Sequence, residues 1–415
     1  MKILLINTSD RNGGAAVAAN RLLQALVSHG IEAQLLVRDK ITNDENVVTI
    51  NRSRFDRFRN YVRFVAERLA IFINNGFSKR NLFQVSTANT GVDITKHPAF
   101  IEADIIHLHW INQGFLSLND IHRIVLSGKP VVWTMHDMWC FTGICHYAGD
   151  CINFEERCES CPLHQDFFFK MALVTQEAKA RIGKITYVGC SKWIANEASK
   201  SALLSKRQIL SIPNPIDTSV YAPTDKVDAR KKLGLDPNKQ YILFGAAKIT
   251  DPRKGATYLK MALEILLSKC PEVLKNVELL LLGGRKSDVA AYFPIQITDL
   301  GYQNNEAQIA LIYSAASIFV IPSLEDNLPN TIMESLACGT PCVGFETGGI
   351  PEMIDHLQTG YLASYMSAED LAEGILWILN QGEEIANRCV EFVNRNYTQD
   401  IVAQQYRELY NRILK

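Results

Sequence analysis

Short apolar runs alternate with amphipathic stretches along most of the chain. Runs such as ILLI and IFVIP do not alternate apolar and polar residues, which indicates strands covered on both faces, as in parallel sheets. The stretches between them predict helices, so repeated strand–helix units and an α/β fold of doubly wound sheets are expected. The predicted strands are Lys2–Ile6, Ala33–Val37, Asp104–Leu108, Pro130–Thr134, Ile185–Gly189, Tyr241–Gly245, Val277–Gly283, Ser317–Pro322 and Pro341–Phe345.

This series breaks once, at Leu210–Asp225, a polar stretch that contains three prolines. A chain of 415 residues is also too long for one ordinary core, so two tandem Rossmann-like domains are predicted. We expect one domain over residues 1–208, a second over 209–395, and a last helix at 396–415 that packs back on the first domain. Ligands of doubly wound sheets bind beyond the carboxyl ends of the strands, so the predicted site is a cleft between the domains.

Residues 52–80 lie outside the pattern of alternating strands and helices in both predicted domains. Their apolar residues follow the spacing of one helical stripe, and eight Arg or Lys residues outnumber the two acids. A basic amphipathic helix of this kind can lie on an anionic membrane surface. The alternative is a stripe packed on its own domain with a basic face in solvent. The stripe consists of Phe55, Phe58, Val62, Val65, Leu69 and Phe72.

Composition excludes several classes of protein. A net charge of −1 gives no overall positive field, so no nucleic-acid partner is expected. No apolar run reaches the ~18–20 residues that span a bilayer. The opening MKILLINTSD predicts a strand and a turn rather than a signal peptide. A cytoplasmic location is therefore expected, with peripheral contact to the inner membrane through residues 52–80 as an addition.

Five of the ten cysteines lie in a Cys-rich loop at residues 140–162, and the last four of them have the spacing C-x5-C-x6-C-x2-C. Four thiolates in a reducing compartment suit a tetrahedral structural Zn²⁺, and His146 is a substitute ligand. Free buried thiols and disulfides are the alternatives. A metal here would hold a loop near the acceptor rather than take part in the chemistry. The candidate ligands are Cys145, Cys151, Cys158 and Cys161.

A second chemical pattern follows the predicted strand Ser317–Pro322, where acidic residues stand among Pro and Gly. Asp326 and Asn327 are cap-type residues, and the sequence predicts a helix from about Asn330 to Cys338. The amides at its start suit an anion such as a diphosphate. Carboxylates repel phosphates but accept two hydrogen bonds from a diol. Amides and acids together predict a nucleotide-sugar site, with Asn327, Leu328 and Pro329 on the donor side.

The same segment resembles the signature of retaining glycosyltransferase family 4, which has the GT-B fold. That signature has two acids separated by seven residues, then A-x-G-x-P and G-G-x-x-E; here Asp326 and Glu334 have the spacing, followed by "ACGTP" and "GGIPE". The resemblance assigns the sugar hydroxyls to Asp326 and the ribose to Glu334. The first acid of the family is usually Glu, and the adjacent Glu325 is one residue out of register, so it stays a donor-side candidate.

The resemblance extends to both predicted domains. "NGGAAVAANRL" places Gly13 and Gly14 after the first strand, where glycine lets the backbone approach a donor diphosphate or an acceptor. "RKG" matches the family's Lys-Gly, so Lys254 is expected to neutralise the leaving diphosphate. The family's Arg is missing, and Lys248 and Arg253 are the candidates that replace it.

The first domain adds "VVWTMHDMWCFTGICHY". His136 ends a predicted strand, and the histidine at this place in the family touches the donor sugar. Asp137 and His109 are acceptor-side candidates. The block "HDMWCFTGICHY" resembles a subgroup that makes bacterial surface polysaccharides of the colanic-acid type.

The resemblance implies a retaining transferase that moves a hexose from a nucleotide-diphosphate sugar to a hydroxyl of a glycan acceptor, which is expected to be lipid-linked. It implies no cofactor or metal for catalysis. The alternatives are a nucleotide-sugar epimerase or hydrolase on the same scaffold, or a non-catalytic sugar-binding protein. An oxidoreductase is a more distant alternative, because no G-x-G-x-x-G follows the first strand.

Overall fold

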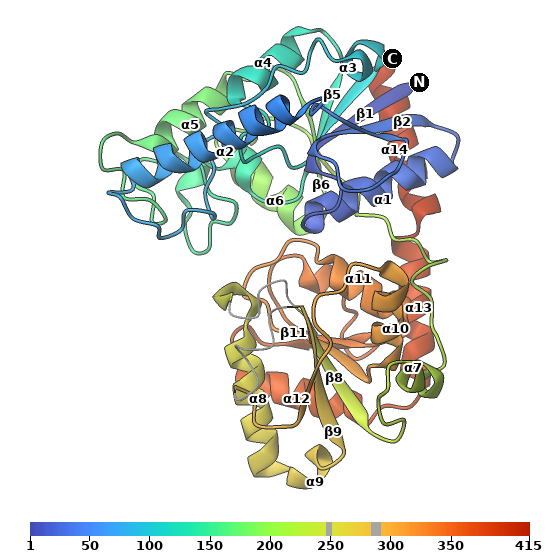
Figure 1. Cartoon of the computed structure of the whole chain (residues 1–415). Coiled ribbons are helices and arrows are strands. Elements are labelled where there is room, and N and C mark those ends of the chain that lie inside the picture. Colours follow the sequence, from blue (N-terminus) through green and yellow to red (C-terminus); the bar gives the residue numbers. More distant parts are fainter. Residues whose placement is uncertain (246–250, 284–291) are drawn as a thin grey trace. The chain divides into compact units, whose positions relative to one another are not determined.

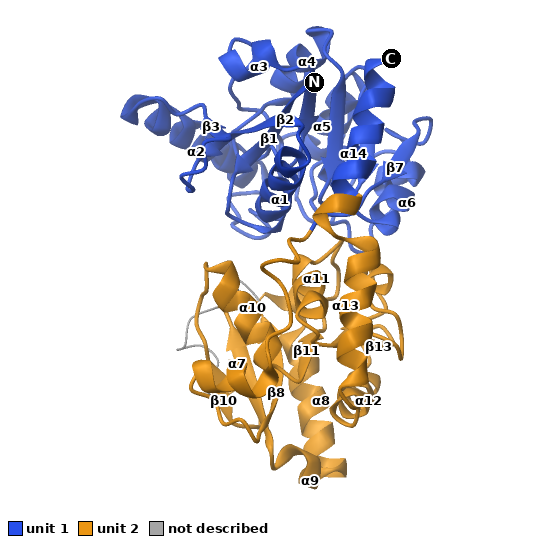
Figure 2. Cartoon of the chain, turned by 90° about the vertical axis from the view of Figure 1, so that its right-hand side faces the viewer, with its two compact units in different colours: residues 1–215, 402–415 blue, residues 216–401 orange. Residues whose placement is uncertain are grey.

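The structure is a computed structural model that describes residues 1–245, 251–283 and 292–415. It divides the chain into two compact units, which Figure 2 colours separately. Unit 1 comprises Met1–Pro215 and Val402–Lys415, and unit 2 comprises Ile216–Ile401. The change from one unit to the other at Pro215 falls inside the predicted proline-containing hinge, Leu210–Asp225.

Unit 1 is built on a seven-stranded sheet with the strand order β3-β2-β1-β4-β5-β6-β7. Figure 1 labels its strands β1, β2, β5 and β6. Every neighbouring pair in this sheet is parallel. From the centre of the sheet the chain adds β2 and β3 beside β1 on one side and β5, β6 and β7 beside β4 on the other, as in a doubly wound sheet. The strands are β1 (Lys2–Ser9), β2 (Glu32–Asp39), β3 (Val47–Thr49), β4 (Ile105–Leu108), β5 (Val131–Met135), β6 (Thr186–Gly189) and β7 (Ile209–Ser211).

Both faces of this sheet are buried, which explains why its strands lack an alternating pattern. Leu4 and Ile6 of β1 belong to one apolar cluster, whereas Ile3 and Leu5 belong to another. The second cluster also contains apolar residues of α1 and of the last helix, α14. The helices of unit 1 are α1 (Gly14–Ser28), α2 (Arg54–Asn74), α3 (Pro98–Glu102), α4 (Leu118–Leu126), α5 (Met171–Ala180), α6 (Lys192–Lys200) and most of α14 (Gln399–Leu414).

Within the described part of unit 2, six parallel strands form one sheet in the order β10-β9-β8-β11-β12-β13. Its strands are β8 (Gln240–Gly245), β9 (Val277–Leu282), β10 (Ile297–Asp299), β11 (Ile318–Ile321), β12 (Cys342–Phe345) and β13 (Gly360–Ala363). Its helices are α7 (Lys226–Lys232), α8 (Ala256–Lys269), α9 (Pro271–Leu274), α10 (Glu306–Ala315), α11 (Asn330–Ala337), α12 (Ala368–Leu379) and α13 (Glu384–Asn396). Residues of α8 and α12 share one apolar core with the central strands.

The prediction of two doubly wound α/β sheets is confirmed, and each predicted apolar run forms a strand. The sequence analysis missed β3, β7, β10 and β13. These four strands are the outermost strands of the two sheets.

Helix α2 shows that one interpretation of residues 52–80 is wrong, the one in which the apolar stripe packs on its own domain. Phe55, Phe58, Val62, Val65 and Leu69 are all exposed. The helix is therefore present, but most of its apolar stripe faces solvent. Among the described residues, no helix has both the length and the apolarity to cross a bilayer.

Candidate active site

The acidic segment joins β11 to α11 in unit 2. Asp326 and Asn327 are buried, while Glu325 is partly exposed. The segment follows directly from Ile321, the last residue of β11, so it lies at the carboxyl end of a parallel strand. This is the edge at which doubly wound sheets bind ligands.

Two cations meet the carboxylate of Asp326. Lys254 Nζ donates a hydrogen bond to Asp326 Oδ2 at 2.6 Å, and an Arg253 guanidinium nitrogen lies 3.7 Å from the same oxygen. Arg253 also donates to the carbonyl oxygen of Glu325 at 2.6 Å, and the amide of Leu324 donates to the carbonyl oxygen of Arg253 at 2.8 Å. The structure therefore brings together the predicted diphosphate cations and the predicted sugar acid.

Charge compensation keeps this buried carboxylate ionised. Burial by itself raises the pKa of Asp326, but the positive charges of Lys254 and Arg253 and the hydrogen bond from Lys254 outweigh it, so the pKa lies below its usual value. The side chains of Lys254 and Arg253 remain 24% and 32% exposed. Both cations are thus accessible from solvent while paired with the acid.

Two glycines let other segments pack directly on the acidic segment. Gly255 has φ +69° and Gly348 has φ +58°, a conformation that favours glycine. A Cβ at Gly255 would overlap the carbonyl oxygen of Pro322, and a Cβ at Gly348 would overlap the carbonyl oxygen of Asp326. Both glycines lie in the motifs "RKG" and "GGIPE", but this role was not predicted, because it depends on contacts distant in sequence.

Helix α11 begins differently from the prediction. Its N-cap residue is Pro329, which makes no side-chain capping hydrogen bond, so the prediction of Asp326 or Asn327 as the N-cap residue is wrong. The reason is that the Asp326 carboxylate binds Lys254 instead. The helix ends at Ala337, and its apolar residues Ile332, Met333, Leu336 and Ala337 are buried.

Glu334 is buried in the middle of α11. The hydroxyl of Tyr313, from α10, donates to its carboxylate at 3.3 Å. Burial and the charge of Glu334 raise the pKa of Tyr313 well above its usual value, so the phenol keeps its proton and serves as a donor. Leu328, a predicted donor-side residue, is also buried.

The remaining donor-side candidates separate into three cases. Lys248 lies outside the described residues, so of the two cations predicted to replace the family's Arg, the structure places Arg253 beside Asp326. Gly13 is the N-cap of α1 with φ +93°, and a Cβ there would meet nothing within 4 Å. Gly14 is the first residue of α1 and is exposed. This turn in unit 1 leaves room for a ligand to approach the backbone.

In unit 1 the predicted histidines lie side by side. His109 and His136 follow the adjacent strands β4 and β5, and His109 Nδ1 lies 2.9 Å from His136 Nε2. Burial lowers the pKa of His136 to about 4 and that of His109 well below its usual value. Both imidazoles are therefore neutral at pH 7, and a neutral imidazole donates at one nitrogen and accepts at the other.

A third histidine, which the sequence analysis missed, supports this pair from within β4. His107 Nδ1 lies 2.7 Å from the hydroxyl of Tyr410, and its Nε2 lies 2.8 Å from Oγ1 of Thr134. Thr134 Oγ1 in turn lies 2.8 Å from the hydroxyl of Tyr406. Helix α14 thus fixes the strand ends that carry the histidines. The alternation of His107 and His109 in "HLHW" was the available indication.

Asp137, predicted on the acceptor side, is engaged within its own unit. Its carboxylate accepts hydrogen bonds from Trp110 Nε1 at 2.8 Å and from the amide of Trp139 at 2.9 Å, and lies 2.7 Å from His146 Nδ1. His146 Nε2 lies 3.0 Å from Ser86 Oγ. Both ring nitrogens of His146 therefore have partners, and its role as a substitute zinc ligand stays a prediction.

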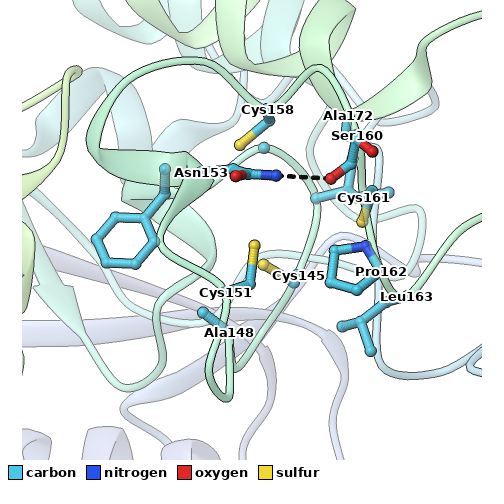
Figure 3. Close-up of a pocket in the computed structure, with 13 residues that line it drawn as sticks. Cys145, Ala148, Cys151, Asn153, Cys158, Ser160, Cys161, Pro162, Leu163 and Ala172 are labelled. Carbon is cyan, nitrogen blue, oxygen red and sulfur yellow. Dashed lines mark hydrogen bonds between the residues drawn. The ribbon is translucent and has the colours of Figure 1, made fainter.

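The four clustered cysteines line one cavity of about 20 Å³, which Figure 3 shows with the labelled side chains around it. A space of this size holds about one water-sized ligand. Burial raises the pKa of Cys145 to about 12 and that of Cys161 to about 11, so these thiols are protonated as they stand. All four are free thiols, and the described residues contain no group of three or more His, Cys, Asp or Glu placed to hold a metal ion.

Structural zinc in this loop stays a prediction. Zinc binding would require the thiols to lose their protons and to move closer together. We expect about one zinc per chain by elemental analysis of protein purified without chelator. Cys151→Ser with Cys158→Ser is expected to lose the metal and to lower the melting temperature, whereas Cys270→Ser, outside the loop, retains both. Metal-free protein whose melting temperature is unchanged by added zinc would identify the cluster as buried thiols.

The unit 2 domain has recognised relatives. Residues 240–381 match the family of glycosyl transferases group 1. This stretch begins at β8 and contains Arg253, Lys254, Asp326 and Glu334. The chain is also 24% identical over 220 residues to N-acetyl-alpha-D-glucosaminyl L-malate synthase of Bacillus anthracis, an alignment that covers 50% of this chain and 55% of that protein. The chain therefore spans little more than half of that relative.

Two solved structures resemble the whole chain. Sucrose-phosphate synthase of Thermosynechococcus elongatus has a TM-score of 0.68 at 16% identity and covers 100% of this chain and 99% of its own. Anabaena Alr3699/HepE in complex with UDP-glucose has a TM-score of 0.63 at 16% identity and covers 99% of this chain and 100% of its own. These likenesses establish the fold, which is the predicted GT-B fold of two Rossmann-like domains.

Proposed function

We propose that the chain is a retaining glycosyltransferase that moves a hexose from a nucleotide-diphosphate sugar to an acceptor hydroxyl. The observation that carries this proposal is the contact of Lys254 and Arg253 with Asp326, inside the stretch that matches glycosyl transferases group 1. The UDP-glucose complex of Alr3699/HepE supports a nucleotide-sugar donor.

The proposed chemistry assigns one task to each group. Breaking the anomeric bond places negative charge on the leaving diphosphate, and Lys254 and Arg253 stabilise this charge where it develops. Asp326 holds Lys254 in place and accepts hydrogen bonds from sugar hydroxyls. Glu334 binds the ribose, and neutral His136 orients the sugar, as the family resemblance implies. In that family the leaving phosphate takes the proton of the acceptor hydroxyl, so no second carboxylate is needed at the anomeric carbon.

For the acceptor we propose a lipid-linked glycan of bacterial surface polysaccharide synthesis. The support is the resemblance of "HDMWCFTGICHY" to that subgroup. The Bacillus anthracis relative is named for a glucosaminyl malate, so a small hydroxy acid is the competing acceptor.

The test uses the full chain with a panel of nucleotide sugars. A donor present at a concentration of 100 times its Kd stabilises the fold by ~2.7 kcal/mol, which a thermal-shift assay detects. The selected donor is then incubated with a polyprenyl-diphosphate-linked sugar, with malate, and without acceptor. We expect nucleoside diphosphate and a glycoside whose anomeric configuration, read by NMR, equals that of the donor. Free sugar as the main product would indicate a hydrolase. An altered sugar on the nucleotide would indicate an epimerase, and binding without turnover would indicate a sugar-binding protein.

A further inference from the structure

Helix α2 of unit 1 exposes most of its apolar stripe and buries several polar residues. Its buried residues are mostly polar or charged: Asn60, Glu67, Arg68, Ile71 and Asn74. Its exposed apolar and aromatic residues are Phe55, Phe58, Tyr61, Val62, Val65 and Leu69. An amphipathic helix of a globular domain ordinarily has the opposite orientation.

Buried charges fix this orientation. The carboxylate of Glu67 accepts hydrogen bonds from the amides of Thr87 and Ala88, each at 3.0 Å, and pairs with the guanidinium of Arg68 at 3.1 Å. Arg68 also donates to the carbonyl oxygen of Val85 at 2.9 Å. Rotating the helix to bury its apolar stripe would break these bonds and expose or orphan both charges, which is costly. The apolar stripe is therefore held outward by the fold.

A second exposed apolar segment is tied to the end of α2. Phe167, Phe168 and Phe169 are 65%, 59% and 52% exposed. The amides of Phe168 and Phe169 donate to Asn74 Oδ1 at 3.1 Å, and Asn74 Nδ2 donates to the carbonyl oxygen of Phe169 at 3.0 Å. Phe77, just beyond the helix, is 61% exposed. The apolar face of α2, Phe77 and Phe167–Phe169 are together called the docking surface below.

The charges beside this surface are positive. Arg52, Arg54, Arg57 and Arg59 are exposed around the start of α2. Outside the buried Glu67, the acid in α2 is Asp56, whose carboxylate accepts a hydrogen bond from Ser53. An anionic surface would neutralise these arginines, whereas the same face of a second copy carries no excess of acids to pair with them.

We propose that the docking surface binds an anionic lipid bilayer, with α2 lying in the plane of the interface. Its aromatic and aliphatic side chains enter the headgroup and acyl boundary, and its arginines pair with acidic headgroups. This proposal does not depend on the proposed function, because it rests on side chains outside the candidate active site.

The experiment measures co-sedimentation of the full chain with phosphatidylcholine vesicles, with and without phosphatidylglycerol. We expect binding to the anionic vesicles that weakens as salt is added. Replacing Arg54, Arg57 and Arg59 by Gln is expected to weaken it roughly a hundredfold, since each arginine near such a surface contributes about fivefold.

A second variant tests the apolar contribution. Phe58→Ser, Val62→Ser and Val65→Ser together are expected to abolish binding to anionic vesicles. The matched control replaces Ile101 and Leu126 by Ser; these apolar side chains are 62% and 70% exposed on α3 and α4, and their loss should leave binding unchanged.

All substituted side chains of the stripe are exposed, so an unchanged melting temperature is the check on folding. Absence of binding to anionic vesicles at low salt would overturn the proposal. So would a dimer in sedimentation equilibrium that the apolar variant abolishes, because the surface would then belong to a second copy. Donor turnover in solution should be the same in every variant.

Discussion

Replacing Lys254 by Met is expected to reduce donor turnover by about 10²–10³-fold, or about 3–4 kcal/mol of barrier. The ammonium would be lost at the point where charge develops on the leaving diphosphate, while the methionine keeps most of the side-chain length. Asp326 would lose its ammonium partner and keep Arg253 at 3.7 Å, so a loss of about 1–3 kcal/mol in unfolding free energy should accompany the kinetic effect. Steady-state kinetics on the donor selected by thermal shift measure kcat and KM separately.

The chain offers a matched control for this substitution. Lys239 also pairs with a carboxylate, that of Glu278, at 2.9 Å in the same unit. It directly precedes β8 and so lies at the amino ends of the strands, away from the edge where ligands bind. Lys239→Met should leave turnover unchanged. Equal losses of turnover in the two lysine variants would refute the assignment of Lys254.

Asp326→Asn separates the two tasks proposed for this acid. The change removes a negative charge beside the cations, so UDP, which has the diphosphate but lacks the sugar of a donor, should bind at least as tightly as to the parent chain. Binding of the nucleotide sugar should weaken, because the neutral amide has one acceptor oxygen where the carboxylate has two for the hydroxyls of a diol. Tighter binding of both ligands would show that Asp326 serves only to hold Lys254.

The central strands could be predicted from the sequence because burial on both faces leaves uninterrupted apolar runs. The edge strands β3, β7, β10 and β13 could not. They contain three or four residues each, VVT, ILS, ITD and GYLA, which is too short to distinguish from a loop. Each pairs with one neighbour only, so their existence depends on a sheet that the local sequence does not describe.

Helix α2 shows a different limit. The spacing of apolar residues located the helix, but an amphipathic pattern does not say which face a domain covers. That choice was decided by Glu67 and Arg68, whose partners lie in residues 82–88. A charged pair three to four turns into an otherwise basic helix was the available indication of a buried polar face.

In the candidate site, the order and spacing of motifs identified Arg253, Lys254 and Asp326, and the structure places these three together. Their direct ion pairing was not predicted, because the sequence analysis assigned the cations and the acids to opposite ends of a donor. The contact requires the turn at 252–255 to lie against the segment after β11. That close approach depends on a glycine at position 255. The motif "RKG" contains this glycine but does not reveal its contact with Pro322.

Gly255→Ala is expected to lower the melting temperature of the chain by roughly 10 °C, corresponding to a loss of about 3 kcal/mol or more. Alanine at φ +69° costs about 1 kcal/mol by itself. The larger part comes from its Cβ, which would overlap the carbonyl oxygen of Pro322 and push the turn away from the acidic segment. Because that turn carries Lys254, donor turnover should fall as well, although the lysine is still present.

Gly234→Ala isolates the backbone contribution. Gly234 has φ +70° in the same unit, and a Cβ there would meet nothing within 4 Å. Its substitution should cost about 1 kcal/mol, or roughly 3 °C, with normal turnover. The difference between the two variants therefore measures the close approach of the two backbones. If Gly255→Ala were no more destabilising than Gly234→Ala and kept full turnover, the turn could move freely, and the position of Lys254 would not depend on its packing against Pro322.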